Sequence, residues 1–394
     1  MQSLITELEK LKKSKLKNRS YMKMALKLAK RGIYTTSPNP AVGCVLVRGG
    51  RIIGKGYHHK AGEPHAEIMA LQEAGYDARG ATAYVTLEPC AHYGRTPPCA
   101  TRLCECGLKK VVIASGDPNP LVNGRGIDIL KKAHIKVEEH VLEKQARYLN
   151  RAFFKAIATH MPYVAVKTGM SLDAKTALSD GRSKWITGAV ARSAVQALRG
   201  RSDAIITGSG TIISDNPSLN VRYQELPEKV RCLLRPEELR QPLKVIVDSS
   251  ARLNPHKYKV FREGKILWCT FTEDGSTKIR EEQLNAHITR LYVPADGGHV
   301  SLQAVLRWLG ERQLRRVLVE AGQSLTSAFI REQLTDELYV FIAPKLLGSC
   351  AREAFVLPEN TDINACGFVL RKCKACGDDV MLHYLKKLSR YAGG

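Results

Sequence analysis

Two short stretches decide how the first half of this chain folds: GEPHAE at residues 62–67, and EPCAHYGRTPPC at residues 88–99. Proline suits the first position of a helix because its missing N–H has no partner there. The first stretch therefore predicts a helix with His65 and Glu67 in its opening turn. Pro97 and Pro98 open a second helix in the same way and place Cys99 in its first turn, where the helix dipole favours a thiolate. Metal-binding side chains are thus expected at two helix starts.

These side chains have the composition of a catalytic zinc site. His65, Cys90 and Cys99 supply one imidazole and two thiolates, which leaves the fourth tetrahedral position for water. A bound zinc ion lowers the pKa of that water towards ~7. Glu67 then acts as a base beside the water, not as a ligand, and passes the proton to a leaving amine. An H-x-E pair followed by P-C and a further cysteine is the pattern of zinc nucleobase deaminases.

Other cysteines offer alternatives to this set. Cys104 and Cys106, one turn further along the second helix, compete with Cys99 for the third ligand position. Cys366, Cys373 and Cys376 are either a second metal site or ordinary thiols, and the absence of a matching pair or histidine nearby favours thiols.

Length and composition set wider limits. The 394 residues correspond to two or three domains, and 44% hydrophobic with 25% charged residues exclude a disordered, collagen-like or coiled-coil protein. No window has ~18 consecutive apolar residues, and the start lacks an apolar signal core, so we expect a cytoplasmic protein without a membrane partner. Eleven cysteines, an odd number, argue against a disulfide framework.

The net charge of +23 suggests an anionic partner, either nucleic acid, a phosphorylated metabolite or a phosphate-rich cofactor. Residues 1–31 alone hold ten Lys and Arg against two Glu. Much of the charge is therefore interpreted as a solvated surface, and nucleic acid is not expected as a partner.

Strands and helices alternate along both halves, which predicts an α/β architecture throughout. The expected strands cover residues 41–47, 51–58, 81–89, 109–115, 135–141, 163–169, 203–208, 243–249, 265–271, 287–293, 316–322 and 337–347. The expected helices cover residues 21–32, 65–74, 97–106, 126–133, 143–159, 188–200, 300–310 and 323–333. His160-Met161-Pro162 breaks the last helix of the first half. We expect a basic N-terminal extension at 1–19 (frayed or a poorly held helix), a first domain at 20–160 that carries the zinc pattern, and a second domain at 161–394.

Several motifs extend beyond the zinc pattern. Eight residues separate Cys90 from Cys99, where most nucleobase deaminases have two. This spacing, with PNPAVG at 38–43 and DPNPLVNGRG at 117–126, resembles the bifunctional riboflavin biosynthesis deaminase/reductases. The second half resembles the reductase domain of that family in VKTGMSLDAKTA (166–177), SKWIT (183–187), LRGRSDAIITGSGTIISDNPSLNVR (198–222), VDS (247–249), VEAG (319–322) and IAPKLLG (342–348).

The resemblance runs from about Tyr21 to the end and implies a fold and two activities. The fold is a cytidine-deaminase-like zinc domain followed by a dihydrofolate-reductase-like domain. The first domain deaminates 2,5-diamino-6-ribosylamino-4(3H)-pyrimidinone 5′-phosphate, and the second uses NADPH to reduce the ribosyl group of 5-amino-6-(5-phosphoribosylamino)uracil to ribityl. The expected cofactors are one Zn²⁺ per chain and NADPH, and a homo-oligomer (dimer or tetramer) is expected.

The resemblance also implies site residues. His58, Arg95 and Asn119 match positions that hold the deaminase substrate, and an arginine fork suits its phosphate. A strand–Gly–helix junction such as EAGQSL at 320–325 presents free N–H groups to a pyrophosphate. The implied cofactor contacts are Gly169, Trp185, Thr211, Asp215, Ser249, Gly322, Gln323, Ser324, Leu325, Thr326, Ser327 and Ala328. The implied reductase substrate contacts are Ser183, Arg199, Leu219, Arg222 and Glu320.

Within this set, Arg199 and Arg222 are expected to clamp the 5′-phosphate. Lys167 and Asp215 are the titratable pair expected to polarise or protonate the sugar. The chain departs from the family pattern at Ala174 (usually Gly), at Asn216 (usually Asp) and at Gln323 (often Gly). None of these departures removes a residue assigned to the chemistry.

Two other functions fit part of the pattern. A nucleic-acid base deaminase would need a basic groove with interleaved aromatic residues beside the zinc site, and aromatic residues make up only 6% of the chain. A non-catalytic scaffold with a relict zinc site would be free to lose Glu67, which is present.

Overall fold

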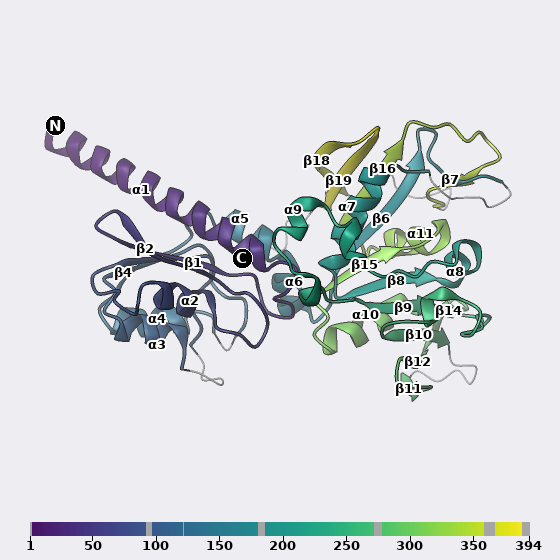
Figure 1. Cartoon of the computed structure of the whole chain (residues 1–394), viewed down its shortest axis with the longest axis horizontal. Coiled ribbons are helices and arrows are strands. Elements are labelled where there is room, and N and C mark those ends of the chain that lie inside the picture. The colour runs from purple at the N-terminus through teal and green to yellow at the C-terminus, as the bar shows by residue number, and fades with distance from the viewer. Residues whose placement is uncertain are drawn as a thin grey trace. The chain divides into compact units, whose positions relative to one another are not determined.

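The computed structural model describes residues 2–91, 97–120, 122–179, 186–271, 278–357 and 367–387. The chain divides into two compact units, Met1–Thr159 and His160–Gly394. Each unit is an α/β structure built on its own sheet (Figure 1). Among the described residues, no helix combines the length and apolar character needed to cross a membrane.

The first unit has a five-stranded sheet in the order β2-β1-β3-β4-β5. Strand β1 runs antiparallel to β2 and β3, whereas β3, β4 and β5 are parallel. The expected Gly-Gly turn joins β1 to β2, and Gly49 and Gly50 adopt the left-handed conformation that it requires, with φ of 58° and 81°. The strands are β1 (Gly43–Arg48), β2 (Arg51–Tyr57), β3 (Thr82–Val85), β4 (Lys110–Ile113) and β5 (Lys136–Glu138).

Helices cover both faces of this sheet, because alternate residues of a strand point to opposite sides. Cys44 and Leu46 pack with the helices of one layer, and Val45 and Val47 pack with those of the other. The first layer contains α2 (Ala66–Glu73), α3 (Cys99–Glu105) and α4 (Arg125–Lys132). The second contains α1 (Gln2–Ala29) and α5 (Glu143–Leu149). The first unit is therefore a three-layer α/β domain, and the predicted α/β class is confirmed.

Two helix predictions differ from the structure. The expected extension at 1–19 and the helix after it form the single helix α1, which a 3₁₀ turn, η1 (Lys30–Gly32), prolongs to the predicted end. The single helix expected over 143–159 is instead two helices, α5 and α6 (Arg151–Thr159). They meet at Asn150, whose buried amide accepts from the Ala41 N–H at 2.8 Å and donates to the Ala41 carbonyl at 2.9 Å. This tertiary contact replaces the continuous helix that periodicity predicts.

The second unit has a ten-stranded sheet in the order β11-β12-β10-β9-β8-β15-β6-β16-β19-β18. The strands from β12 to β16 in this order are parallel to their neighbours, and β11, β19 and β18 are antiparallel. The strands are β6 (Tyr163–Ser171), β8 (Ala204–Gly208), β9 (Leu243–Val247), β10 (Ile266–Phe271), β11 (Arg280–Gln283), β12 (Ile288–Val293), β15 (Arg316–Glu320), β16 (Glu337–Ala343), β18 (Phe368–Cys376) and β19 (Asp379–Lys386).

Helices again cover both faces. One layer contains α10 (Leu302–Glu311) and α11 (Gln323–Arg331), and the other contains α7 (Ala189–Gly200) and α8 (Ser209–Asp215). The sequence did not predict α8, β11 or the β18–β19 hairpin. The remaining elements are short: β7 (Lys175–Ala177), η2 (Tyr223–Glu225), α9 (Glu228–Arg231), η3 (Pro236–Glu238), η4 (Lys259–Phe261), β13 (Ala295–Asp296), β14 (His299–Val300) and β17 (Arg352–Glu353).

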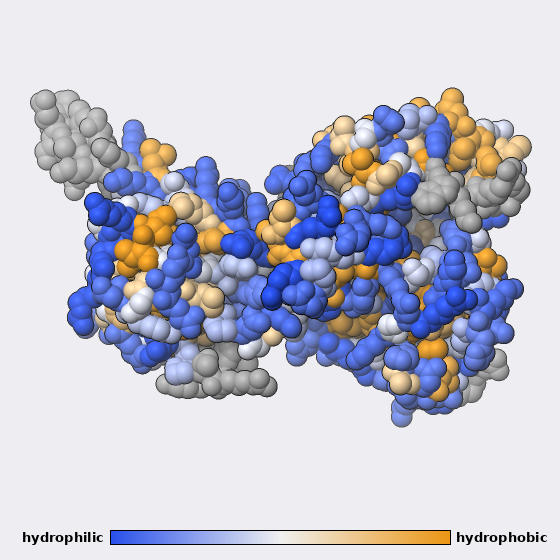
Figure 2. Space-filling model, viewed as in Figure 1, coloured by the Kyte–Doolittle hydropathy of each residue, from blue (hydrophilic) through white to orange (hydrophobic). Residues whose placement is uncertain are grey.

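Apolar side chains are exposed next to the small β7/β17 sheet of the second unit. Leu172, Leu346 and Val356 follow β6, β16 and β17 and are 62%, 73% and 52% exposed. Figure 2 shows apolar surface over this part of the second unit. Elsewhere the view is mainly hydrophilic, in keeping with the high content of Lys and Arg.

Candidate active sites

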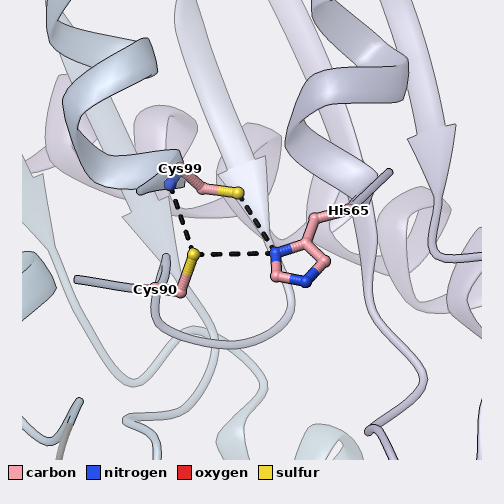
Figure 3. A group of neighbouring side chains, drawn as sticks. All are labelled: His65, Cys90 and Cys99. Carbon is pink, nitrogen blue, oxygen red and sulfur yellow. Dashed lines mark hydrogen bonds between the residues drawn. The ribbon is translucent and has the colours of Figure 1, made fainter. Parts of the chain in front are cut away.

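The three predicted zinc ligands come together in the first unit. His65 is the N-cap of α2, Cys99 is the first residue of α3, and Cys90 lies in the loop after β3. His65 Nδ1 lies 3.3 Å from Cys99 Sγ and 3.6 Å from Cys90 Sγ, and the Cys99 N–H donates to Cys90 Sγ at 3.2 Å. Figure 3 shows the imidazole nitrogen pointing between the two sulfurs. All three ligand atoms lie within 4.8 Å of one another.

The electrostatics of this cluster suit a cation. The pKa of Cys90 falls to about 4, mainly because the Cys99 side chain hydrogen-bonds to it and also because of His65. The Cys99 pKa rises well above its usual value through the same Cys90 contact and through burial. The contact between the two cysteines thus favours the thiolate form of Cys90, and a divalent cation would also favour the thiolate form of Cys99. One nitrogen and two sulfurs at this spacing match the donor set of a three-ligand zinc site.

Glu67 lies in the first turn of α2 and is 3% exposed. Burial raises its pKa to about 7, although the nearby His65 opposes the shift. A carboxyl group with a pKa near neutrality is suited to accept a proton and release it again. The structure thus places a buried carboxyl group with a raised pKa beside the ligand cluster.

The alternative cysteines lie elsewhere. Cys104 Sγ is 4.0 Å from the Ile129 carbonyl, and burial raises the pKa of both Cys104 and Cys106. Within the described ranges, His65, Cys90 and Cys99 form the one group of metal-type ligands, and Cys373 and Cys376 belong to none. Cys366 lies outside the described residues.

Of the three residues predicted to hold the deaminase substrate, only His58 and Asn119 lie among the described residues. His58 is buried next to the cluster, with its ring 5.3 Å from that of His65. Its Nδ1 lies 3.2 Å from the Pro64 carbonyl, and its Nε2 lies 3.1 Å from the amide nitrogen of Asn39. Asn119 is in the loop after β4, and Arg95 lies outside the described residues.

Sequence reasoning missed two side chains of this region. Asn39 belongs to the PNPAVG motif, which supported the resemblance without an assigned role. Glu88 belongs to the EPC motif and is 4% exposed. Each is a polar residue beside a proline in a motif of the sequence, and this pattern is the signal by which both could be found.

In the second unit, a charged cluster lies at the carboxyl ends of the parallel strands. Lys167 on β6 and Glu320 on β15 are register partners, and their Nζ and Oε2 atoms lie 3.6 Å apart. Arg199 on α7 donates to both oxygens of Glu320, from Nε at 2.6 Å and from Nη2 at 3.1 Å. Burial alone would raise the pKa of Glu320, but Arg199 and Lys167 lower it overall. Glu320 is therefore an anion that holds two cations at this edge.

The geometry shows where three of the predicted residues lie and which groups they contact. The carboxylate against Lys167 is Glu320, whereas Asp215 is exposed at the end of α8. The guanidinium fork of Arg199 faces Glu320, so its predicted phosphate clamp is already occupied by a carboxylate. Arg222 is half-exposed, and its Nη2 donates to Glu225 at 2.7 Å. Strand register and helix packing decide these pairs, and the sequence pattern does not show either.

The predicted cofactor residues gather where α8 and α11 begin. The Gly322 N–H donates to Thr211 Oγ1 at 2.9 Å, and a Cβ on Gly208 would lie 3.5 Å from Leu325 Cδ2. Ser249, just after β9, accepts from the Val300 N–H at 3.1 Å. Gly208 and Val247, the last residues of β8 and β9, are register partners, so the ends of β8 and β9 also lie side by side.

Some of the other residues predicted to contact cofactor or substrate face the protein interior, and others lie outside the described residues. Thr326 Oγ1 donates to the Ala321 carbonyl at 3.2 Å, and Ser327 Oγ accepts from the Val356 N–H at 2.8 Å, so both buried hydroxyls face protein. A Cβ on Gly169 would lie 3.3 Å from Thr187 Cγ2. Leu219 is buried, and Gln323, Ser324 and Ala328 lie on α11. Ser183 and Trp185 lie outside the described residues.

Arg252 is a residue of this region that sequence reasoning missed. It is exposed, and its Nη2 donates to Ser209 Oγ, in the first turn of α8, at 3.1 Å. The same Nη2 would lie 4.0 Å from a Cβ on Gly210, the residue before Thr211. The preceding VDS motif had drawn attention only to Ser249.

Fold and site together define a class: a zinc-dependent pyrimidine deaminase domain joined to a nucleotide-dependent reductase domain. Residues 15–115 match the cytidine and deoxycytidylate deaminase zinc-binding region, and residues 162–382 match the RibD C-terminal domain. The chain belongs to the RibD family of riboflavin biosynthesis proteins. It is thus a bifunctional enzyme with deaminase and reductase activities, and Zn²⁺ and NADPH are its cofactors.

Individual relatives cover nearly the whole chain. It is 44% identical to riboflavin biosynthesis protein RibD of Escherichia coli, over 92% of this chain and 98% of the relative. The corresponding protein of Haemophilus influenzae is 46% identical, over 93% of this chain and 97% of that protein. The structure of Acinetobacter baumannii RibD superposes with a TM-score of 0.85 at 42% identity, and the match covers 95% of this chain and 99% of that one.

A further solved structure is that of a protein named for both activities. It is the Thermotoga maritima diaminohydroxyphosphoribosylaminopyrimidine deaminase/5-amino-6-(5-phosphoribosylamino)uracil reductase. The two structures superpose with a TM-score of 0.81 at 32% identity, and the match covers 95% of this chain and 100% of that one. The expected family, fold class and pair of activities are confirmed.

Proposed function

We propose that the two units catalyse consecutive reactions on a phosphorylated pyrimidine. The first unit deaminates 2,5-diamino-6-ribosylamino-4(3H)-pyrimidinone 5′-phosphate. The second reduces the ribosyl group of the resulting 5-amino-6-(5-phosphoribosylamino)uracil to ribityl. The observation that carries the proposal is the His65, Cys90 and Cys99 cluster with buried Glu67 beside it. We assign residues 20–160 to the deaminase and 161–394 to the reductase.

In the deaminase, His65, Cys90 and Cys99 hold the zinc. When bound, zinc supplies a Lewis acid that makes water nucleophilic near neutral pH. Glu67 accepts the water proton and returns it to the departing amino group, a role that its pKa of about 7 supports. His58 and Asn39 bind the pyrimidine beside the cluster, Asn119 contacts the substrate from the loop after β4, and Arg95 holds its phosphate.

In the reductase, NADPH supplies the hydride. Lys167 donates the proton to the opening sugar, and Glu320 with Arg199 holds the Lys167 ammonium in place. Thr211, whose Oγ1 is held by the Gly322 N–H, binds cofactor phosphates together with Arg252, and Ser249, Gly169 and Trp185 complete the cofactor site. Arg222 clamps the substrate phosphate, while Ser183 and Leu219 contact the rest of the substrate. Asp215 contacts the cofactor.

We also propose that the chain forms a homo-oligomer in the cytoplasm. Edge strand β18 supports self-association because Val369 and Leu370 on it are more than half exposed. All ten cysteines that the structure describes are free, as expected in a reducing compartment.

The metal assignment is tested with Cys99→Ser and the matched variant Cys104→Ser. We expect wild type and C104S to hold about one zinc per chain and to release ammonia from the diaminopyrimidine phosphate. C99S should lose both the metal and ammonia release, measured by elemental analysis and a coupled ammonia assay. Full zinc in C99S, or loss of zinc in C104S, would refute this ligand set.

The phosphate assignment is tested with Arg222→Ala. Loss of a bidentate contact to phosphate should raise the reductase KM for the phosphorylated substrate by about tenfold or more, with a smaller change in kcat. Arg235→Ala is the matched control, because Arg235 is also exposed and pairs with a glutamate three residues later, Glu238. Equal KM values for R222A and wild type would rule out Arg222 as the clamp.

A further inference from the structure

Glu88 is a buried carboxylate for which the proposed mechanism has no use. It follows β3, lies two residues before Cys90, and is 4% exposed. A buried carboxylate is costly unless its oxygens are well satisfied. Its contacts therefore indicate what it does.

Four backbone N–H groups donate to Glu88, and they come from two neighbouring segments. Oε1 accepts from Gly126 at 3.0 Å and from Ile127 at 3.3 Å, both in the first turn of α4. Oε2 accepts from Asp117 at 3.3 Å and from Gly124 at 3.1 Å, at the two ends of the loop that precedes α4. These four partners are all main-chain amides, and together they use the acceptor capacity of the carboxylate.

The sequence of the receiving segment is adapted to this approach. A Cβ on Gly126 would lie 2.0 Å from the Pro89 carbonyl oxygen and 3.3 Å from Glu88 Oε1, so only glycine lets α4 come this close. Gly124 has φ of 78°, a conformation that also favours glycine. The GRG sequence at 124–126 therefore explains part of the DPNPLVNGRG motif.

The loop held by Oε2 carries Asn119. The Asn119 N–H donates to Asp117 Oδ1 at 2.8 Å, and the Asn119 carbonyl accepts from Val122 and Asn123, each at 2.8 Å. Asn119 thus sits in a turn whose first and last amides, those of Asp117 and Gly124, both bind one oxygen of Glu88. Along the chain, Glu88 is followed by Pro89 and then by the predicted zinc ligand Cys90.

We propose that Glu88 is a positioning residue that fixes Asn119 relative to the zinc ligands, and so sets how tightly the deaminase binds its pyrimidine. The proposal rests on the substrate contact assigned to Asn119 under the proposed function. The same carboxylate joins the loop of Cys90 to the loop of Asn119, so the distance between metal and substrate contact depends on it.

The test is a double-mutant cycle in the full-length holoenzyme with Glu88→Gln and Asn119→Ala. Glutamine has the same shape, but its NH₂ group would face N–H donors and release one of the two segments. We expect E88Q to raise the deaminase KM for the diaminopyrimidine phosphate by about tenfold, with kcat changed by less than about threefold. Zinc content and reductase kcat/KM should stay at wild-type values. In the N119A background, E88Q should change KM by less than about twofold.

Glu73→Gln is the matched control, because the exposed Glu73 carboxylate also accepts a main-chain N–H, from Lys55 at 2.9 Å. E73Q should leave the deaminase KM unchanged. If E88Q does not fold, the cycle is measured with Glu88→Asp, which keeps the charge but is too short to reach both segments.

Three results overturn the proposal: an unchanged KM in E88Q, loss of zinc in E88Q, or the same KM increase with and without Asn119. The failure of the proposed function looks different. An N119A variant with the wild-type KM refutes the substrate contact itself, and wild-type protein that releases no ammonia refutes the deaminase assignment.

Discussion

At the scale of single residues, the chemistry of the first site was predictable and that of the second was only partly so. His65, Glu67, Cys90 and Cys99 lie in short motifs whose prolines fix helix starts, so spacing alone predicts their meeting. The partner of Lys167 was not predictable, because Glu320 reaches it through strand register across 153 positions of sequence. Such pairs depend on the sheet, not on local pattern.

Glu67→Gln should reduce ammonia release by about 10²–10⁴-fold, because glutamine cannot take the proton from water or return it to the amine. NADPH oxidation with the already deaminated substrate should remain at the wild-type rate. Both rates are measured on the same preparation, by coupled ammonia assay and by absorbance of NADPH. Loss of both activities in E67Q would contradict the separation of the two sites.

Ala174 and Asn216, two departures from the family pattern, both adopt left-handed conformations, with φ of 57° and 44°. Alanine is strained there, whereas asparagine tolerates it. Asn216 also accepts the Lys259 N–H at 2.8 Å through its side chain. Only the first departure should therefore cost stability.

Ala174→Gly should stabilise the second unit by about 1 kcal/mol and raise its midpoint by about 2–4 °C, because glycine removes the strain. Trp185, Trp268 and Trp308 all belong to this unit, so tryptophan fluorescence follows its unfolding alone. Asn216→Gly is the control and should give no gain, since it removes a hydrogen bond. An equal gain in both variants, or none in A174G, would contradict this explanation.

At the scale of elements, periodicity predicted the central strands and the long helices of both units. It failed where tertiary contacts decide the outcome. Asn150 divides the expected helix over 143–159 because its amide binds Ala41, more than a hundred residues away. Helix α8 was missed because Gly208 and Gly210 make SGTIISD look like a loop. Strand β18 was missed because its exposed, lysine-rich edge lacks apolar alternation.

The buried side chain of Lys244 joins strand β9 to the short helix η4. Its side chain is 1% exposed within β9, and its ammonium donates to the carbonyls of Val260 at 3.3 Å and Glu263 at 2.7 Å. These bonds fix η4 against the sheet. Burial lowers the pKa of Lys244 to about 8.

This shift predicts a pH dependence of stability. Between about pH 8 and pH 10.4 the unfolded chain keeps the lysine proton and the folded chain loses it, so the free energy of unfolding rises with pH. Relative to Lys244→Met, wild type should gain about 3 kcal/mol across this window and show no such slope below about pH 8. Urea titrations followed by tryptophan fluorescence measure the difference.

Lys265→Met, which changes an exposed lysine just before β10, is the control for this comparison. Its difference from wild type should stay flat over the same range. A flat difference for K244M as well would show that the ammonium is not desolvated in the folded protein.

At the scale of the whole molecule, the sequence predicted two α/β units with separate chemistries, and the family comparisons agree with both activities. The net charge of +23 was a poor guide to function. The anionic ligands of the two sites need only a few cations, and several of those, such as Arg199 and Arg222, already face glutamates. The rest of the positive charge is distributed over the surface and α1.

The central claim, that one chain deaminates a pyrimidine phosphate and then reduces its product, is tested most directly by identifying products. The purified protein is given the diaminopyrimidine phosphate with and without NADPH, and the products are separated and identified by mass. Without NADPH, we expect ammonia and 5-amino-6-(5-phosphoribosylamino)uracil. With NADPH, we expect the ribityl compound and equal amounts of ammonia released and NADPH oxidised. NADPH oxidation without ammonia release, or a ribityl product that keeps its second amino group, would contradict the account.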